Sequence, residues 1–449
     1  IAPTTNGKPA FRMHPRMITL MPRMIRFIYD KWRFDNKAKL ELPELHEEYT
    51  RLGEENIESL DENEIIMRID ALYNIHCRTT YFNIVIPLLM QVYFSILRSR
   101  LKSVNIEIDQ FDLTEGMDEL KDFDPGVHLY NLSCSYHQFD QPTQDAILSS
   151  TYSDFMQMSD IAEFQIEVES FMQSFGHLSD SGTDFSNVPW RENPEILLRI
   201  ISEYDLVENT KRGQKQVDDV PFRGLSRWLF KLVYHRARIY RLYRENVSSL
   251  YTYGLGLFRT YYLALGDRFV DHRYLDERDD IFYLYDEEIR GCISGDVNGQ
   301  NFRDLVSERK EEIESCADIM LPEIIYGESN PPPIVQTKNV LTGTPTSRGY
   351  YTGNTKILRG INDFHKLEKG DILVIPHSDV GWTPLFSTAG AVVAESGGIL
   401  SHSSIIAREY NIPAVVSVDG AMQLSDSMLV TIDGYKGKVV VHHHDGMPD

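Results

Sequence analysis

The sequence predicts a multidomain protein of the α and α/β classes, in which a large, mostly helical domain precedes a small domain of mixed strands and helices. Over residues 22–102 apolar residues recur at intervals of three and four, the spacing of a buried helix face. The stretch 327–333 (Gly-Glu-Ser-Asn-Pro-Pro-Pro) is typical of a semi-rigid linker. After it, short β-rich runs alternate with helical patterns, which indicates a change of fold class.

Composition limits the possible partners. The 449 residues carry a net charge of −22, from 45 basic and 67 acidic side chains. So acidic a chain is poorly suited to nucleic acid or an anionic membrane as its main partner. Any phosphate site must therefore be built locally, from a few arginines and helix N-termini.

The cysteines and the apolar runs point to a cytoplasmic protein. The four cysteines are widely spaced and form no CxxC pair, so neither a zinc site nor a disulfide framework is indicated, and we expect no metal. The most apolar window, 82–96, contains Asn83, Pro87 and Gln91 and is too short to span a membrane. Because the first residue is Ile1 and not methionine, we expect the chain to be a piece of a longer one.

Several elements are expected in the helical domain. A long helix over 81–101 should kink or break near Pro87, and helices should follow at 143–158 and 161–175, after a polar, irregular stretch at 111–141. A basic helix over 230–270 should be interrupted by Gly254 and Gly256. Patterns at 281–289 and 302–320 close the domain.

The loop that begins at Gly176-His177 and reaches Pro194 is unusually polar for the interior of a helical domain. Loops of this kind often carry function.

The predicted domains are a mostly helical domain at 1–326, a hinge linker at 327–340 and a small domain at 341–449. Strands are expected at 350–358, 371–376, 391–394, 414–418, 428–432 and 438–441.

One stretch of the small domain points to phosphate chemistry. After the strand at 391–394 come Gly397 and Gly398, then Ser401 and His402 at the start of an amphipathic helix that runs to Tyr410. A helix start offers unpaired N–H groups and a dipole that favours anions, and an imidazole nitrogen can attack phosphorus.

Each of these residues also has a structural interpretation. A lone histidine on a helix is more often a capping or core residue, but the order of parts around His402 favours a phosphoryl carrier. Ser401 and Ser403 can donate hydrogen bonds to phosphate, while Gly397 and Gly398 allow close backbone approach. Helix capping explains the serines equally well.

The segment Gly-Gly-x-x-Ser-His-x-x-Ile-x-Ala-Arg-Glu-x-x-Ile-Pro-Ala-Val resembles the phosphohistidine domain of the phosphoenolpyruvate-utilising family. That family includes phosphoenolpyruvate synthase, pyruvate phosphate dikinase and rifampin phosphotransferase. The resemblance implies a β/β/α swivelling domain whose His402 shuttles a phosphoryl group. Thr383-Pro384 is similar to a family segment that faces the histidine loop, with a structural or phosphate-lining role.

The helical domain resembles the same family. The residues His177, Asp184 and Arg191 lie in a stretch similar to the rifampin phosphotransferase group, which implies a substrate-binding role, and for His177 that of acceptor-side acid or base. Arg244 matches the first basic residue of an Arg-Glu-x-Pro-Lys-like segment and is implied to clamp phosphate, although the Pro-Lys is absent. Arg238 and Arg241 are expected to form a solvated face.

The resemblance implies a dikinase-like phosphotransferase with paired acceptors, incomplete without an ATP-grasp domain that lies upstream or on a separate chain. ATP and Mg²⁺ would then bind outside this chain, and a hydroxyl of a small, aromatic or apolar molecule would receive the phosphoryl group. Two alternatives stay open. One is a condensing ligase of the prodigiosin type that uses the same phosphohistidine, and the other is a non-catalytic relative that binds a ligand or partner.

Overall fold

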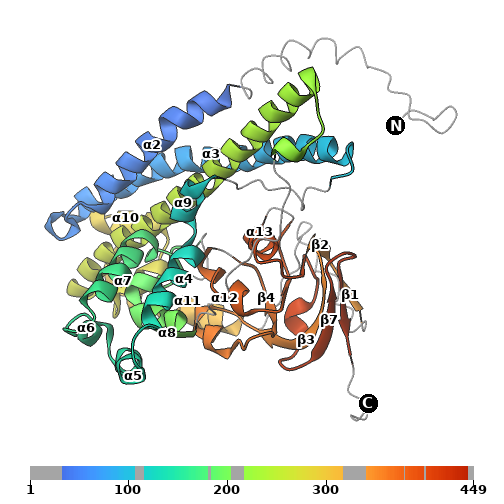
Figure 1. The fold of residues 1–449 in the computed structure, drawn as a ribbon. Helices are drawn as coiled ribbons and strands as arrows, with labels where there is room; N and C mark the ends of the chain where they lie inside the picture. Colours follow the sequence, from blue (N-terminus) through green and yellow to red (C-terminus); the bar gives the residue numbers. More distant parts are fainter. Residues whose placement is uncertain are drawn as a thin grey trace, which may run out of the picture.

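The computed structural model describes residues 33–106, 116–179, 184–203, 217–316, 340–378, 380–398 and 401–442. Its large helical part precedes a small domain built on a mixed sheet, which confirms the fold class (Figure 1). The predicted linker lies outside the described residues except for Val340, which begins the first strand.

Three helices form the first layer of the helical part: α2 (Phe34–Gly53), α3 (Glu62–Lys102) and α9 (Gly224–Asp271). The start of α3 is fixed by a capping box, in which Asp61 and Glu64 each accept a hydrogen bond from the other's backbone N–H. Buried apolar side chains of the three helices form one core, which extends to α10 (Asp286–Ser294) and α11 (Phe302–Ser315).

The prediction that Gly254 and Gly256 interrupt the basic helix is wrong, because α9 runs for 48 residues through both. The helix α3 continues through Pro87 without a break, and a kink there stays a prediction. The two glycines instead allow close packing. A Cβ at Gly254 would lie 2.7 Å from ring atoms of Tyr49, and one at Gly256 would lie 2.9 Å from the Cβ of His177.

A second group of helices comprises α4 (Pro125–Tyr136), α5 (Gln141–Ser149), α6 (Tyr152–Phe155), α7 (Ala162–Phe175) and α8 (Pro194–Glu203). The prediction of an irregular stretch over 111–141 is therefore wrong where it overlaps α4; residues 107–115 lie outside the described part. Asp124 accepts a hydrogen bond from the Gly126 N–H and Pro125 occupies the first turn, which starts the helix. The single helix predicted over 143–158 is two helices, because Thr151 caps a new start at Tyr152.

Short 3₁₀ turns link these helices. They are η1 (Ile57–Ser59), η3 (Asp118–Phe123), η4 (Trp190–Glu192), η5 (Val217–Asp219), η6 (Arg278–Tyr283) and η7 (Gly299–Asn301).

The small domain holds one eight-stranded sheet in the order β1-β8-β7-β3-β4-β5-β6-β2. The strands are β1 (Val340–Thr342), β2 (Thr344–Ser347), β3 (Tyr350–Ile357), β4 (Ile372–Ile375), β5 (Ala391–Ala394), β6 (Ala414–Val416), β7 (Leu429–Asp433) and β8 (Lys438–Val441). The pairs β3–β4, β4–β5 and β5–β6 are parallel, and the other pairs are antiparallel. The first two strands were not predicted.

Alternate residues of the parallel strands enter two different cores. Ile372, Val374 and Val393 face a core shared with β7 and β8. Leu373 and Val392 face the other way, into a core shared with the helices α4, α7 and α8. The small domain also carries η8 (Ile361–Lys366), η9 (Val380–Trp382), α12 (Leu385–Thr388), α13 (His402–Glu409) and η10 (Ala421–Gln423).

Close backbone packing joins the helical part to the small domain. A Cβ at Gly126, in the first turn of α4, would lie 2.8 Å from the Thr383 Cγ2 and 3.0 Å from the Tyr410 hydroxyl. A Cβ at Gly381 would lie 2.7 Å from the carbonyl oxygen of Ser179. At each of these points a glycine of one part therefore packs directly against atoms of the other part.

One helix in the described part, α3, is long and apolar enough to cross a bilayer by length and composition alone. Its residues Phe82, Ile86 and Met90 are buried in the helical core, while Ile84 and Leu88 are exposed. Core helices of other proteins meet the same criterion, so this observation carries no conclusion about location.

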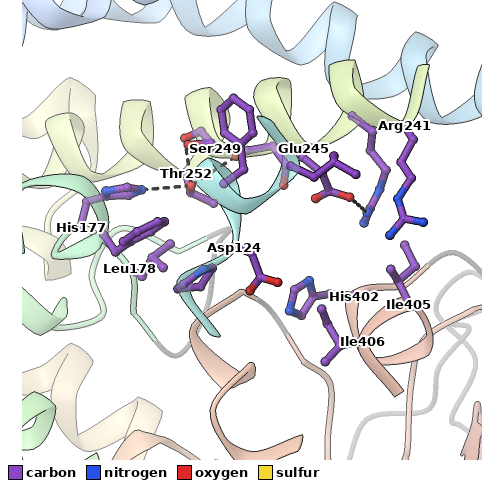
Figure 2. Close-up of a pocket in the computed structure, with 16 residues that line it drawn as sticks. Asp124, His177, Leu178, Arg241, Glu245, Ser249, Thr252, His402, Ile405 and Ile406 are labelled. Atoms are coloured by element: carbon purple, nitrogen blue, oxygen red, sulfur yellow. Dashed lines mark hydrogen bonds and ion pairs between the residues drawn. The ribbon is translucent and has the colours of Figure 1, made fainter. Parts of the chain in front are cut away.

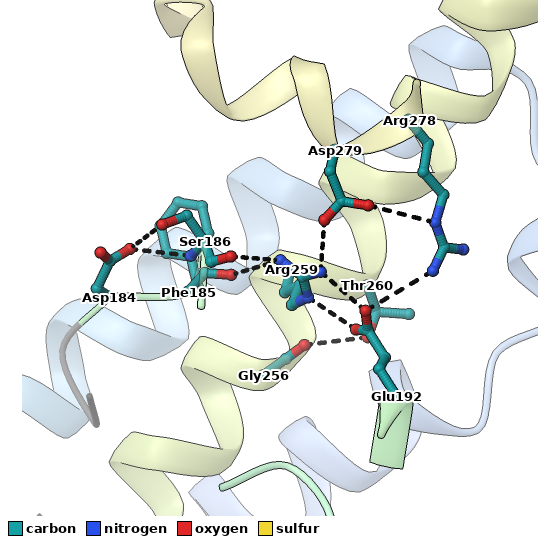
Figure 3. Close-up of polar contacts among 9 residues, drawn as sticks. All are labelled: Asp184, Phe185, Ser186, Glu192, Gly256, Arg259, Thr260, Arg278 and Asp279. Carbon is teal, nitrogen blue, oxygen red and sulfur yellow. Dashed lines mark hydrogen bonds and ion pairs between the residues drawn. The ribbon is translucent and has the colours of Figure 1, made fainter. Parts of the chain in front are cut away.

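A buried arginine fixes the loop between α7 and α8 onto α9 (Figure 3). Arg259 is 2% exposed and donates to both carboxylate oxygens of Glu192, at 2.7 and 2.8 Å. It also donates to Asp279 at 2.6 Å and to the carbonyl oxygen of Ser186 at 2.7 Å. These bonds hold two chain segments against the middle of α9.

We expect Arg259→Ala to lower the free energy of unfolding by about 3 kcal/mol, because it leaves Glu192 without its bidentate partner. Equilibrium urea unfolding measures the change. Arg278→Ala is the matched control, since Arg278 approaches the same two carboxylates at 3.6–3.7 Å but is exposed, and it should cost less than about 1 kcal/mol. Equal losses in the two variants would contradict this account.

Candidate active site between the helical part and the small domain

The strand β5 and the helix α13 position His402. Ser401 is the N-cap of α13, with extended backbone angles, and its hydroxyl accepts a hydrogen bond from the Ser404 N–H. Gly397 has a φ of +135°, a backbone conformation that side chains rarely allow. His402 is thereby the first residue of the helix, as the sequence predicts.

The glycines and serines around His402 hold the turn together. The hydroxyls of Ser401 and Ser404 both donate to the carbonyl oxygen of Gly398, at 2.8 and 2.7 Å. Ser403 is buried, and its hydroxyl lies 3.0 Å from that of Ser401. A Cβ at Gly397 would lie 3.2 Å from the Ser401 hydroxyl oxygen. These bonds account for the residues structurally, and their contact with phosphate stays a prediction.

The imidazole of His402 is held by the small domain and faces the helical part. Its Nε2 lies 2.8 Å from the hydroxyl of Thr383, which is fully buried. Burial and, to a smaller extent, the positive charge of Arg244 lower the pKa of His402 to about 3. The ring is therefore neutral near pH 7, the form that is nucleophilic.

A pocket separates His402 from the helical part (Figure 2). The space between its walls, open mouth included, is about 680 Å³. The helices α4, α9 and α13, with the turn η3 and the loop after α7, supply its walls. Its lining residues are Leu120, Phe123, Asp124, Pro125, Phe175, His177, Leu178, Arg241, Arg244, Glu245, Ser248, Ser249, Thr252, His402, Ile405 and Ile406.

One face of α9 supplies the polar wall, with lining residues that recur every three to four positions from Arg241 to Thr252. Arg244 donates to Glu245 at 2.6 Å, so this end of the pocket contains an ion pair. The prediction of a solvated face is wrong for Arg241, which lines the pocket. Arg238 is partly buried and lies against Tyr234, whose hydroxyl it contacts at 3.2 Å.

His177 lies at the far end of the pocket and is 6% exposed. Thr252 donates its hydroxyl hydrogen to backbone carbonyls of its own helix, so it accepts one from the Nε2–H of His177, 3.2 Å away. The Nδ1 of His177 is buried and has no hydrogen-bond partner. Burial, with a smaller effect of the charge of Arg191, lowers the pKa of His177 to about 3.

Two other predicted substrate residues lie outside the described pocket lining. Asp184 accepts hydrogen bonds from the backbone N–H and the hydroxyl of Ser186, and so caps a local turn. Arg191 is exposed, and its backbone N–H donates to Gly176 at 2.8 Å. The structure brings together His402, Arg244 and His177, but not these two.

Asp124 is the pocket residue that was missed in the sequence. The sequence Asp-Pro-Gly at 124–126 is typical of a helix start and could have indicated α4. It was overlooked because the polar composition of the stretch suggested a loop. Burial raises the pKa of its carboxyl group, and the negative charge of Glu245 adds to the effect. The structure brings this carboxyl group to the same pocket as His402.

Comparison with known proteins places this site in a family. Residues 367–437 match the family of the PEP-utilising enzyme, mobile domain. The chain is 27% identical over 309 residues to an uncharacterized phosphotransferase, YvkC, of Bacillus subtilis, covering 62% of this chain and 36% of that protein. It is 24% identical over 301 residues to a rifampicin phosphotransferase of Bacillus cereus, covering 61% of this chain and 34% of that protein. It is 26% identical over 320 residues to chondramide synthase cmdD of Chondromyces crocatus, covering 62% of this chain and 8% of that protein.

The small domain is thus a mobile domain of the kind found in phosphoenolpyruvate-utilising enzymes. Beyond this domain, the chain is similar to rifampicin phosphotransferases at 24–30% identity. It spans about a third of the length of the first relatives that it matches. A solved structure, aconitase X of Thermococcus kodakaraensis, is similar over 23% of this chain and 98% of its own at 18% identity, with a TM-score of 0.19 that is too low to carry an argument.

We expect Arg244→Met to raise the pKa of His402 above about 3, because it removes a nearby positive charge. The pKa should stay below the ordinary value of about 6.5, since burial is the larger cause. An NMR titration of the His402 ring measures it. Arg238→Met, a change on the same helix at a residue that lies against Tyr234, should leave it unchanged; equal shifts would contradict this account.

His177 should make the protein less stable in acid. Its pKa is about 3 in the folded chain and about 6.5 in the unfolded chain, so only the unfolded chain gains the proton as the pH falls between these values. Its contribution to stability should therefore fall by about 2 kcal/mol from pH 7 to pH 5.

Urea unfolding of His177→Gln at the two pH values tests this expectation. The loss of stability between them should be smaller than in the unchanged chain by about 2 kcal/mol. His235→Gln, at an exposed position of α9, is the control and should preserve the full loss. A His177→Gln variant with the full loss would show that His177 does not carry the effect.

Proposed function

We propose that the chain is the acceptor-binding and carrier portion of an ATP-dependent phosphotransferase. His402 takes a phosphoryl group from an ATP-grasp domain outside this chain and passes it to a hydroxyl of a small organic acceptor. The single observation that carries the proposal is that His402, at the start of α13, faces arginines of α9 across a pocket between the two parts.

The geometry supports each chemical step that the chain would perform. The neutral ring of His402 is a nucleophile near pH 7, and the arginines at 241 and 244 supply positive charge for the oxygens of a transferred phosphoryl group. The N-terminal end of α13 offers further N–H groups. Phosphoryl transfer depends mainly on positioning and charge, and the pocket provides both.

The rest of the pocket indicates the class of acceptor. Leu120, Phe123, Phe175 and Leu178 form apolar walls near the hydroxyls of Ser248 and Ser249. A ligand with an aromatic or apolar body and a polar edge fits this combination. His177 contributes a neutral, buried ring to the far wall of the pocket, where its hydrogen bond to Thr252 holds it in place.

The donor side belongs to the proposal as well. Enzymes of this family generally depend on ATP and Mg²⁺. We propose that both bind to an ATP-grasp domain, which lies upstream or on a separate chain. We also propose that the protein acts in the cytoplasm. The described residues contain no group of three or more His, Cys, Asp or Glu that could hold a metal. In this dikinase-like proposal the helical domain ends at residue 326, and the segment 327–340 is the hinge on which the small domain moves between the ATP-grasp domain and the acceptor.

One comparison favours a second candidate. The chain matches a protein named as a synthase, chondramide synthase cmdD, so a condensing ligase that uses the same phosphohistidine is the alternative. In that case a coupled product and free phosphate would form, whereas the first candidate forms a phosphate ester.

Labelled phosphate tests the carrier role. The chain is mixed with labelled ATP, Mg²⁺ and a separately supplied ATP-grasp domain, and in parallel with labelled phosphoramidate, a small phosphoryl donor that needs no such domain. We expect acid-labile label on the chain in at least the second reaction. His402→Ala should remove it, and His365→Ala, an exposed histidine of the same domain, should retain it.

Label that persists in His402→Ala would overturn the assignment. No label from either donor would favour a ligand- or partner-binding protein without phosphate traffic.

A further inference from the structure

We infer that Asp124 accepts the proton of the acceptor hydroxyl when phosphohistidine 402 transfers its phosphoryl group. The inference rests on the proposed function and adds to it a residue and a substrate class. It comes from the position of one carboxyl group relative to the carrier histidine.

Asp124 faces the carrier from the N-cap position of α4. One of its carboxylate oxygens accepts a hydrogen bond from the Gly126 N–H at 2.8 Å, which fixes the side chain at the helix start. Figure 2 shows the carboxyl group directed toward the ring of His402 across the pocket. Both side chains line the same cavity, from different parts of the chain.

The distance between these two groups is set by close packing. Gly126, two residues after Asp124, has no space for a Cβ, because Thr383 and Tyr410 of the small domain lie within 3.0 Å of its position. The same Thr383 contacts the Nε2 of His402. Asp124 is therefore held opposite the carrier histidine only while the two parts are docked.

The transfer needs a proton acceptor. The acceptor oxygen forms a bond to phosphorus, the N–P bond of phosphohistidine breaks, and its electron pair stays on the ring nitrogen of His402. The hydroxyl proton moves to the carboxylate of Asp124, which becomes a neutral carboxylic acid and later releases the proton to solvent. Atoms and charge balance without a further reactant.

The other candidate bases of the pocket are less suited. Glu245 is held in an ion pair by Arg244 at 2.6 Å. His177 uses its Nε2–H toward Thr252, and its Nδ1 is enclosed where solvent does not reach. Asp124 receives backbone hydrogen bonds and forms no ion pair that the structure describes.

Charges around Asp124 tune its affinity for a proton. Burial and the carboxylate of Glu245 on α9 raise its pKa, while hydrogen bonds from the N–H groups of Gly126 and Val127 and the nearby His128 lower it, with a net increase. Arg241 and Arg244 of α9, His402 of α13 and His177 of the loop after α7 complete the titratable and charged groups of the pocket. A raised pKa makes this carboxylate a better base than an ordinary aspartate.

The role also selects the class of acceptor. A hydroxyl loses a proton when it is phosphorylated, whereas a carboxylate has none to lose at neutral pH. A base opposite His402 therefore favours alcohols and phenols over the carboxylates that a condensing ligase would activate.

The test uses the chain loaded on His402 with labelled phosphoramidate, and water as the smallest hydroxyl acceptor. Release of phosphate from Asp124→Asn should be slower than from the unchanged chain by on the order of 10²-fold, while loading is unchanged. The amide still caps α4, so the helix is preserved. Asp140→Asn, the corresponding cap of the exposed helix start of α5, is the matched control and should not slow release.

The pH profile separates a base from a structural residue. In the unchanged chain the release rate should contain a component that falls as the pH drops and Asp124 becomes protonated, and this component should vanish in Asp124→Asn. Equal rates and equal profiles in the two chains overturn the inference while leaving the carrier role intact. Failure of the unchanged chain to load overturns the proposed function and this inference with it.

Discussion

The site depends on the close contact between the first turn of α4 and the small domain. Gly126 meets Thr383 and Tyr410 with no room for a side chain, and Gly381 meets the carbonyl of Ser179 in the same manner. Around these points the buried residues of α4, α7 and α8 and one face of the parallel strands form a single core. This contact places the start of α13 opposite α9, and without it His402 would face solvent.

The long helix α9 organises the opposite side. Over three turns it presents, in order, two arginines with a glutamate and then hydroxyls, of which that of Thr252 contacts His177. Two turns further on, Arg259 binds the loop that carries His177 to the same helix. One unbroken helix thus sets the spacing between the carrier end and the acceptor end of the pocket. The glycines within it permit this, since their missing side chains leave space for Tyr49 and His177.

Local patterns were sufficient to predict the fold class and the place of His402. Strands β5 and β8 have the predicted limits, because their short apolar runs are bounded by turn residues. The edge strands β1 and β2 were missed, since runs of three and four residues are too short to show a periodic pattern, and β2 also contains a proline. The two glycines were wrongly expected to interrupt α9. The sequence shows that glycine destabilises a helix locally, but it does not show the tertiary contacts that its missing side chain permits.

The partners of His402 were harder to predict for the same reason. Asp124 and Arg241 come from two separate segments that meet His402 only through packing between the two parts. Thr383, which contacts the Nε2 of His402, was expected near the histidine only from the family resemblance. Nothing in the local sequence of α4 shows that its cap faces a histidine almost 280 positions later. Asp184, in contrast, is near His177 in sequence but caps a local turn. Arg191 acts on His177 through its charge without lining the pocket.

The most direct measurement of the central claim is the covalent position of phosphorus on the loaded chain. A chain with ¹⁵N-labelled histidines, loaded with phosphoramidate at neutral pH, would be studied for one-bond coupling between phosphorus and nitrogen. Our account predicts a single coupled signal, assigned to the imidazole of His402 among the 14 histidines. A coupled signal on another histidine, or a phosphorus signal with no nitrogen attached, would contradict it.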